Sequence, residues 1–263
     1  SYPDAWVATI VSTPFHLDVL ATVAARRKQT LCAMLDLDAG MHRTGIGFGP
    51  DAVKLYRKID ADQFLDPSGF HLYDGHDNFS DVVQREAAAQ RNIDSLQEFK
   101  QQIESAGMLV PCVVAGGSFS FAYYARTEGM YGSPGTFIYW DIGYSTAMPD
   151  MPFRWAALIL TQVVDRHPDA GTITTDLGSK GISSDLPVEE RAYLLDQDKA
   201  QFIQQSEEHG VFRIPGKLPR VGDYLLAVPG HICPTTIRYP GIHVIDTAGE
   251  VIDYYLHTAR DRL

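Results

Sequence analysis

Apolar and polar positions follow two different patterns along the chain, and the first extends to about residue 145. Segments 15–28, 50–59 and 80–107 carry apolar residues at helical spacing. Between them lie short runs, rich in β-branched and aromatic residues, that have the length of buried strands. These runs are "WVATIVST" (6–13), "LCAMLDLD" (31–38), "GFHLYDGH" (69–76), "VPCVVAGG" (110–117) and "GTFIYWD" (135–141). Strands that alternate with helices predict a parallel sheet.

The pattern changes after about residue 150. The segments that follow are strand-like with few helical stretches: 154–166, 171–183, 221–231 and 241–259. Thr247-Ala248-Gly249 is a turn signal between two strands. We therefore expect a β/α domain over residues 1–150 and a β domain over residues 151–263, joined near "AMPDMPF" (147–153), whose two prolines suit a linker.

The number of strands does not complete a closed barrel. The first 145 residues hold five strand-plus-connection units, whereas a closed β/α barrel has eight. In such a barrel the loops after the strands carry the active site, and the runs here end in small or polar residues. The expected fold is α/β: a (β/α) TIM-type barrel, incomplete at its N-terminus, followed by a C-terminal β domain. An open or doubly wound sheet is the alternative.

Composition narrows the class of protein. With 263 residues and 45% apolar content, the chain can fill a substantial core. Its net charge of −11 argues against nucleic acid and anionic membranes as partners and favours small molecules. Three widely spaced cysteines form no disulfide framework, and no apolar run approaches the roughly 18 residues of a membrane span. We expect a cytoplasmic protein.

Two kinds of turn at the predicted strand tips are candidates for ligand binding. Arg43 lies between Gly40 and Gly45, where its guanidinium can reach a ligand; pairing with Asp36 or Asp38 is the alternative. Glycine-rich turns after strands supply N–H donors for phosphate, or are simply tight turns. Two such turns are Gly116-Gly117-Ser118 and Gly135-Thr136.

The stretch "VPGHICPTT" (228–236) is a candidate metal site. If it is an extended strand, His231 and Cys233 point to the same face and can hold one ion between them. Because two ligands do not complete a coordination sphere, a structural role is the alternative. A thiolate and an imidazole favour zinc, with manganese as the second choice.

The segment "DAGMHRTG" (38–45) resembles a turn of alanine racemase-like enzymes, the fold-type III enzymes that use pyridoxal phosphate (PLP). Within that group the chain is most similar to D-threonine aldolases and their D-serine dehydratase relatives. The blocks that carry this similarity run in order through the chain: "LYDGHD" (72–77), "VVAGGSFSF" (113–121), "SPGTFIYWD" (133–141), "DLGSKGISSD" (176–185), "SEEHG" (206–210), "VGDYLLAVPGHICPT" (221–235) and "TARDR" (258–262).

The resemblance implies a PLP site at the strand tips. Tyr73 would pack or hydrogen-bond near the cofactor together with Arg43, and His76 would contact substrate unless its role is structural. Ser133 holds the position where alanine racemases usually carry an arginine against the pyridine nitrogen. The cofactor phosphate would lie on the glycine-rich turns, at Gly116, Gly117, Ser118, Gly135 and Thr136.

The resemblance also implies a reaction. A divalent ion on His231 and Cys233 would bind the β-hydroxyl of a D-amino acid, and breaking the Cα–Cβ bond would yield glycine and an aldehyde, as in a D-threonine aldolase. A dehydratase acting on D-serine or D-3-hydroxyaspartate is the alternative, because aldolase-type relatives often carry aspartate where this chain has Cys233. A homodimer is expected, since alanine racemase-like enzymes commonly complete their pocket across subunits.

The Schiff-base lysine of this group lies on the first barrel strand. None of the seven lysines here is expected at a comparable strand tip, so we nominate none. We expect a truncated chain, in preference to one completed by a separate polypeptide or a degenerate, non-catalytic PLP-binding homologue. An ordinary β/α enzyme acting on sugars or phosphates would use similar glycine turns. An open barrel is expected to expose apolar strand edges.

Overall fold

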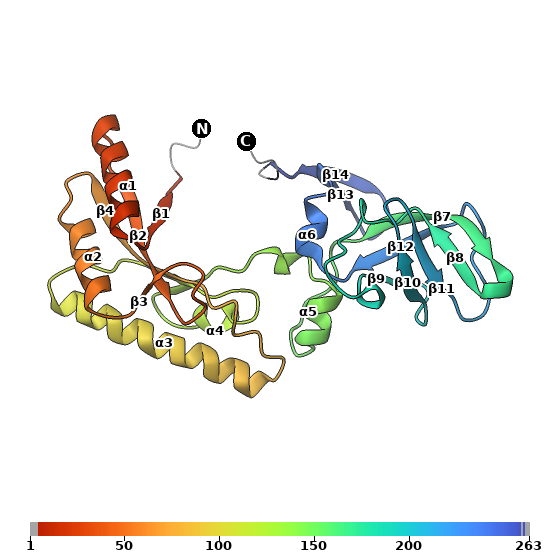
Figure 1. Ribbon diagram of the computed structural model, residues 1–263, viewed down its shortest axis with the longest axis horizontal. Coiled ribbons are helices and arrows are strands. Elements are labelled where there is room, and N and C mark those ends of the chain that lie inside the picture. Colours follow the sequence, from red (N-terminus) through yellow and green to blue (C-terminus); the bar gives the residue numbers. More distant parts are fainter. Residues whose placement is uncertain (1–4, 259, 261–263) are drawn as a thin grey trace. The chain divides into compact units, whose positions relative to one another are not determined.

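The computed structural model describes residues 5–258 and residue 260 (Figure 1). The chain divides into two compact units, residues 1–135 and residues 136–263. The boundary expected near residue 150 therefore falls inside the second unit. In the block 258–262, residues 259, 261 and 262 lie outside the described residues.

Five parallel strands form the sheet of the first unit in their order along the chain. They are β1 (Ala8–Val11), β2 (Leu31–Asp38), β4 (Leu65–Leu72), β5 (Val113–Ala115) and β6 (Met130–Gly132). The short β3 (Ile46–Gly47) adds to the end of β2. A doubly wound sheet would reverse its order at a switch point, and this sheet does not. The strand order is that of a β/α barrel, which confirms the expected fold class.

The predicted helices are confirmed, with ends set by local capping. They are α1 (Pro14–Arg27), α2 (Pro50–Asp60) and α3 (Val82–Ser105), followed by the short α4 (Phe121–Tyr124). The Thr13 hydroxyl accepts from the N–H of His16 at the start of α1, and Lys28 ends that helix in the left-handed conformation. The Asp81 carboxylate accepts from the N–H of Gln84 at the start of α3.

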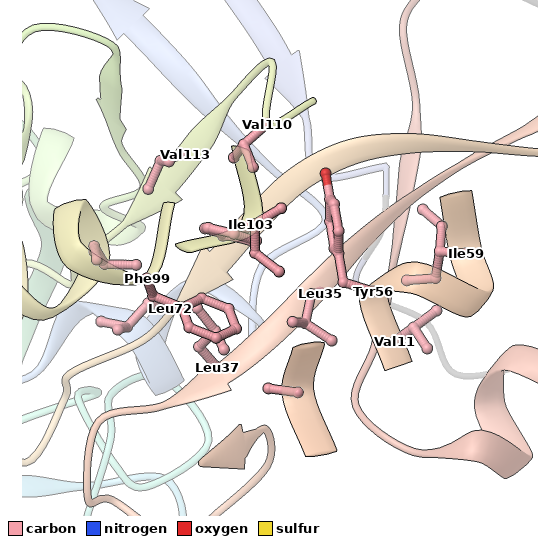
Figure 2. Packing of buried hydrophobic residues seen from close by; sticks show 14 of the residues in the cluster. Val11, Leu35, Leu37, Tyr56, Ile59, Leu72, Phe99, Ile103, Val110 and Val113 are labelled. Atoms are coloured by element: carbon pink, nitrogen blue, oxygen red, sulfur yellow. The ribbon is translucent and has the colours of Figure 1, made fainter. Parts of the chain in front are cut away.

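Aliphatic side chains of the strands pack against the helices in one core (Figure 2). Leu35 of β2 and Leu72 of β4 belong to this core together with Phe99 of α3. Tyr56 of α2 is fully buried and donates its hydroxyl hydrogen bond to the Leu109 carbonyl at 2.6 Å. Burial, with a further contribution from the charge of Asp60, raises the pKa of Tyr56. The buried hydroxyl is therefore satisfied and uncharged.

The prediction of a strand over 135–141 is wrong. The fifth strand, β6, lies earlier, and residues 136–138 form a 3₁₀ turn, η1 (Thr136–Ile138). Trp140 has a φ of 52°, which a strand cannot accommodate, and its ring stacks on Tyr144 with 5.1 Å between centroids. The aromatic residues that suggested a strand therefore pack on one another instead of on the two faces of a sheet.

The second unit is an all-β domain with short helical turns, as expected. Its six-stranded antiparallel sheet has the order β10-β11-β8-β7-β12-β9, and β13 and β14 form a separate hairpin. Thr247-Ala248-Gly249 lies in the loop of that hairpin. The bounds are β7 (Ile159–His167), β8 (Thr172–Thr175), β9 (Ala192–Leu194), β10 (Gln201–Gln205), β11 (Gly210–Arg213), β12 (Tyr224–Pro229), β13 (Gly241–Ile245), β14 (Val251–Leu256), α5 (Ile142–Ala147), α6 (Ile232–Thr236), η2 (Pro168–Ala170) and η3 (Val188–Glu190).

Apolar side chains are exposed at the β1 edge of the first sheet, as expected for an open barrel. Ile10 of β1 is 46% exposed, and Phe15 of the following helix is 72% exposed. Among the helices of the described residues, none combines the length and the apolar character that a membrane span requires.

Candidate functional site

The polar residues of the first unit gather where its parallel strands end. The loops that follow β2, β4 and β5 begin at Ala39, Tyr73 and Gly116, directly after each strand. Because parallel strands end at the same edge of a sheet, these loops share one face of the unit. Most of the residues predicted to bind PLP lie in these loops or in the one that follows β6.

Arg43 lies over the ring of Tyr73, with 4.2 Å between the guanidinium carbon and the ring centroid. This cation–π contact holds the arginine beside the tyrosine without consuming its N–H donors. The alternative pairing of Arg43 with an aspartate is wrong. Asp36 instead pairs with His71 of the neighbouring strand at 2.7 Å, and Asp38 pairs with His42 at 2.8 Å.

Asp38 shapes the turn that carries Arg43. One carboxylate oxygen accepts from the N–H groups of Gly40 and His42, and the other lies 2.8 Å from the His42 ring nitrogen Nδ1. Burial alone would raise the pKa of Asp38, but these hydrogen bonds outweigh it, so the pKa is lowered. Gly45 also fits this turn closely, since a Cβ there would lie 2.7 Å from the Asp38 nitrogen.

The variant Asp38→Asn is expected to lose a pH-dependent part of the stability. Because folding lowers this pKa, the contribution is complete above the unfolded value of about 4 and is lost as the pH falls through the lower folded value. Urea unfolding between about pH 7 and about pH 3 measures the effect. The wild type should be more stable than the variant at neutral pH, and the difference should close in acid. An equal difference at both pH values would contradict the assignment.

The glycines after β5 allow a close approach of the backbone to aromatic rings. A Cβ on Gly116 would lie 2.6 Å from the Tyr124 ring, and one on Gly117 would lie 3.0 Å from the Tyr73 ring. The Gly116 N–H donates to the Leu72 carbonyl and the Gly117 N–H to the Asp74 carboxylate. These two N–H groups are therefore engaged within the chain, and the lack of a Cβ lets the Tyr124 and Tyr73 rings pack directly on the backbone of this turn.

The other residues predicted to bind the phosphate and the ring follow β5 and β6 along the chain. Ser118 continues the glycine turn after β5, and the Ser133 hydroxyl, after β6, donates to the Gly116 carbonyl at 2.9 Å. Gly135 ends the first unit, and no atom lies within 4 Å of a Cβ built there. Thr136 begins the 3₁₀ turn η1 of the second unit. Their proposed contacts with a phosphate stay predictions.

His76 lies in the loop after β4, close to the turn after β2. Its ring nitrogen Nε2 is 3.9 Å from an oxygen of Asp77 and 3.6 Å from the position that a Cβ on Gly40 would take. The side chain is 34% exposed. Its contact with substrate stays a prediction.

His231 and Cys233 do not lie on a strand, and the strand geometry predicted for them is wrong. β12 ends at Pro229, His231 occupies the N-cap of α6, and Cys233 is an exposed residue within that helix. Gly230 lies against the backbone at the end of η3, where a Cβ would lie 1.9 Å from the Glu190 carbonyl oxygen. The alternation of a strand therefore does not place these two side chains.

Asp185, which was not among the residues predicted to bind a metal or cofactor, contacts His231. Its carboxylate lies 2.6 Å from His231 Nδ1 and also accepts a hydrogen bond from the Ser183 hydroxyl. Burial alone would raise the pKa of Asp185, but the hydrogen bonds from Ser183 and His231 have the larger effect, so the pKa is lowered. An ionised carboxylate only accepts, so Nδ1 carries the proton and the lone pair of a neutral imidazole is on Nε2. The only sequence signal was the position of Asp185 at the end of the block "DLGSKGISSD".

A buried carboxylate holds the backbone next to His231. Asp141 caps α5 by accepting from the N–H of Tyr144 at 2.7 Å, and its second oxygen accepts from the N–H of Ile232 at 2.8 Å. Burial raises the pKa of Asp141, and these hydrogen bonds oppose that rise. Asp141 and Asp185 together fix the backbone after His231 and the direction of its ring.

The donor chemistry of this turn fits a divalent metal with two protein ligands. In metal-binding histidines, a carboxylate commonly accepts from one ring nitrogen and so leaves the other nitrogen to bind the ion. In the part of the chain that the structure describes, no group of three or more His, Cys, Asp or Glu residues could hold an ion. His231 Nε2 and Cys233 Sγ are the donors that would bind it.

The first unit fits the non-covalent part of a PLP site. Arg43, held over Tyr73, suits an anionic group of the cofactor, but no lysine joins them. All seven lysines lie among the described residues, and none is at the carboxyl end of a parallel strand, as expected. Lys28 ends α1, Lys54 and Lys58 are on α2, Lys100 is on α3, and Lys180, Lys199 and Lys217 lie in loops of the second unit.

Comparisons with known proteins agree with the two units. The alanine racemase N-terminal domain family matches residues 2–142, and the putative serine dehydratase domain family matches residues 156–245. The chain is 26% identical over 245 residues to a 3-hydroxy-D-aspartate aldolase of Paracoccus denitrificans (strain Pd 1222), covering 88% of this chain and 61% of that protein. The chain thus spans about three fifths of the length of the curated relatives that it matches.

Solved structures show the same fold. The D-threonine aldolase from Filomicrobium marinum superposes with a TM-score of 0.88 at 24% identity, covering 97% of this chain and 70% of that one. D-threo-3-hydroxyaspartate dehydratase from Delftia sp. HT23 gives a TM-score of 0.80 at 17% identity, covering 97% and 73%. The strand order of the first unit and the match over residues 2–142 lead to one conclusion: the chain belongs to the alanine racemase-like family of fold-type III enzymes.

Proposed function

We propose that this chain forms part of a PLP- and divalent-metal-dependent lyase that cleaves D-threonine and related D-β-hydroxy-amino acids to glycine and an aldehyde. The observation that carries the proposal is the His231 imidazole, held at Nδ1 by Asp185 so that Nε2 keeps its lone pair, two residues before Cys233. The family supports a PLP enzyme, and the relatives include aldolases for D-β-hydroxy-amino acids.

Each residue has a role that its surroundings suit. PLP, when bound, supplies an electron acceptor for the bond broken at Cα, and the metal lowers the pKa of a bound hydroxyl group. Arg43 would bind an anionic group of cofactor or substrate, and Tyr73 holds that arginine in place. His231 and Cys233 would bind the metal, with zinc favoured over manganese by the thiolate and imidazole donors.

A D-serine or D-3-hydroxyaspartate dehydratase is the second candidate. The presence of Cys233, where aldolase-type relatives often carry aspartate, favours it, and a dehydratase is among the structural relatives. A third candidate is a non-catalytic PLP-binding protein, which would agree with the absence of a lysine at the strand tips of residues 5–258.

Product analysis separates these candidates. The protein is incubated with PLP, Zn²⁺ or Mn²⁺, and each of D-threonine, D-3-hydroxyaspartate and D-serine. An aldolase releases glycine and an aldehyde from each substrate, whereas a dehydratase releases ammonia and a 2-oxo acid. Glycine formed from D-threonine is the expected result. Ammonia as the sole product would assign the dehydratase instead.

Cofactor chemistry tests the third candidate. Borohydride reduction of the protein with PLP, followed by peptide mapping, shows whether a lysine is labelled. Reversible PLP binding with neither a covalent adduct nor any product would identify a carrier. We also propose that the protein is a homodimer, which light scattering at several concentrations measures.

A further inference from the structure

Asp74 connects two loops at the strand tips of the first unit. It follows Tyr73 in the loop after β4, is 2% exposed, and accepts three hydrogen bonds. One oxygen accepts from the Ser120 hydroxyl at 2.7 Å and the Gly117 N–H at 3.1 Å. The other accepts from the Tyr124 hydroxyl at 2.8 Å. All three donors belong to the loop after β5 or to α4, so one buried carboxylate ties these segments to the β4 loop.

The Tyr73 ring lies in a slot between these segments. A Cβ on Gly75 would lie 2.4 Å from that ring, and one on Gly117 would lie 3.0 Å from it. The ring is therefore in close contact with glycine backbone of both loops. Because Asp74 sets the distance between the loops, it also sets the width of the slot, and Tyr73 in turn carries Arg43.

The donors to Asp74 are themselves fixed. Tyr124 is fully buried, and burial followed by the nearby charge of Asp74 raises its pKa, so the hydroxyl keeps its proton to donate. The Ser120 hydroxyl accepts from the Gly117 N–H at 3.1 Å while it donates to Asp74. Loss of one member of such a buried network leaves another group unpaired.

We propose that Asp74 is a positioning residue for the cofactor: with Tyr124 and Ser120, it holds the β4 and β5 loops at the spacing that Tyr73 and Arg43 need to bind PLP. The inference rests on the proposed PLP site. It adds a residue that contacts no ligand itself and acts through its neighbours. It predicts that loosening the network weakens cofactor binding by more than the loss of a comparable buried hydrogen bond elsewhere in the unit.

The variant Tyr124→Phe, with Tyr56→Phe as its matched control, tests the proposal. Each variant removes one hydroxyl from a buried tyrosine of the first unit. Tyr124→Phe loses the hydrogen bond to Asp74, and Tyr56→Phe loses the one to the Leu109 carbonyl. We expect both to lower the melting temperature by similar amounts, on the order of 2–4 °C. Titration with PLP, followed by absorbance, should show about tenfold weaker binding for Tyr124→Phe alone. Asp74→Asn should weaken binding at least as much.

Hydrogen exchange gives a readout that needs no cofactor. Amide exchange of segments 73–77 and 116–120 should accelerate in Tyr124→Phe and Asp74→Asn, and stay at the wild-type rate in Tyr56→Phe. If the wild type binds no PLP, the proposed function fails, and the exchange rates still decide whether Asp74 holds the loops. If Tyr124→Phe and Asp74→Asn match Tyr56→Phe in exchange and in PLP affinity, the positioning role is overturned.

Discussion

The variant His231→Ala is expected to abolish tight binding of a divalent ion. The imidazole is the donor that the fold prepares, because Asp185 binds Nδ1 and leaves Nε2 available. Removing it leaves the exposed Cys233 as a single ligand. Asp185→Asn keeps the imidazole but loses the carboxylate that orients it, and should weaken metal binding by roughly 10–100-fold. Isothermal titration with Zn²⁺ and the visible spectrum of the Co²⁺-loaded protein measure both effects.

Matched controls lie in the same unit. His167 lies 3.9 Å from Asp165, beyond hydrogen-bonding distance, so His167→Ala removes a histidine near an aspartate away from α6. Asp198 accepts a hydrogen bond from the Tyr193 hydroxyl, so Asp198→Asn makes the same chemical change as Asp185→Asn at a different site. Both controls should bind metal as the wild type does. Unchanged metal affinity in His231→Ala would rule out the proposed site.

The variant Gly69→Ala is expected to prevent the native pairing of β4 with β5. A Cβ at this position would lie 1.8 Å from the Cys112 carbonyl oxygen, which accepts the N–H of Phe70 at 2.9 Å. The obstacle is backbone, which cannot rotate away as a side chain can, and β4 lies in the middle of the sheet. We expect a loss on the order of 4–5 kcal/mol in the free energy of unfolding. Urea unfolding, or the yield of folded protein, measures it.

Gly107→Ala separates the clash from the cost of backbone conformation. Gly107 also has a positive φ, +83° against +107° at Gly69, but no atom lies within 4 Å of a Cβ built there. This variant should lose only the roughly 1–2 kcal/mol that a non-glycine residue pays in the left-handed region. Equal losses in the two variants would show that the contact with Cys112 does not limit the strand spacing.

Elements with a strong local pattern were predictable from the sequence. The run 31–38 is β2 residue for residue, and the segment 50–59 is α2 to within one residue at its end. Periodicity and capping act between residues close in the chain, so they are visible without the fold. The strand prediction over 135–141 was wrong because the aromatic residues of this run are compatible with a strand and with a local aromatic cluster. Only the packing in the folded protein distinguishes the two.

Candidate chemistry was predictable by residue type and resemblance, but not by contact. The blocks containing Arg43, Tyr73 and His231 were identifiable in the sequence, whereas the partner of each was not. Arg43 lies on Tyr73 and not on an aspartate, and His231 binds Asp185, which is 46 residues away along the chain. Such pairs depend on how distant loops meet, which no local pattern encodes.

The sequence by itself determined the α/β character of the first unit, the β character of the second, and the family to which the chain belongs. These follow from local hydrophobic periodicity and from ordered blocks of residues. Only the tertiary structure decided that β12 ends before His231, that Asp185 orients its ring, and that Asp74 ties two loops together. The physical reason is that a carboxylate accepts hydrogen bonds from the donors that the fold brings within reach, and these donors lie far from it along the chain.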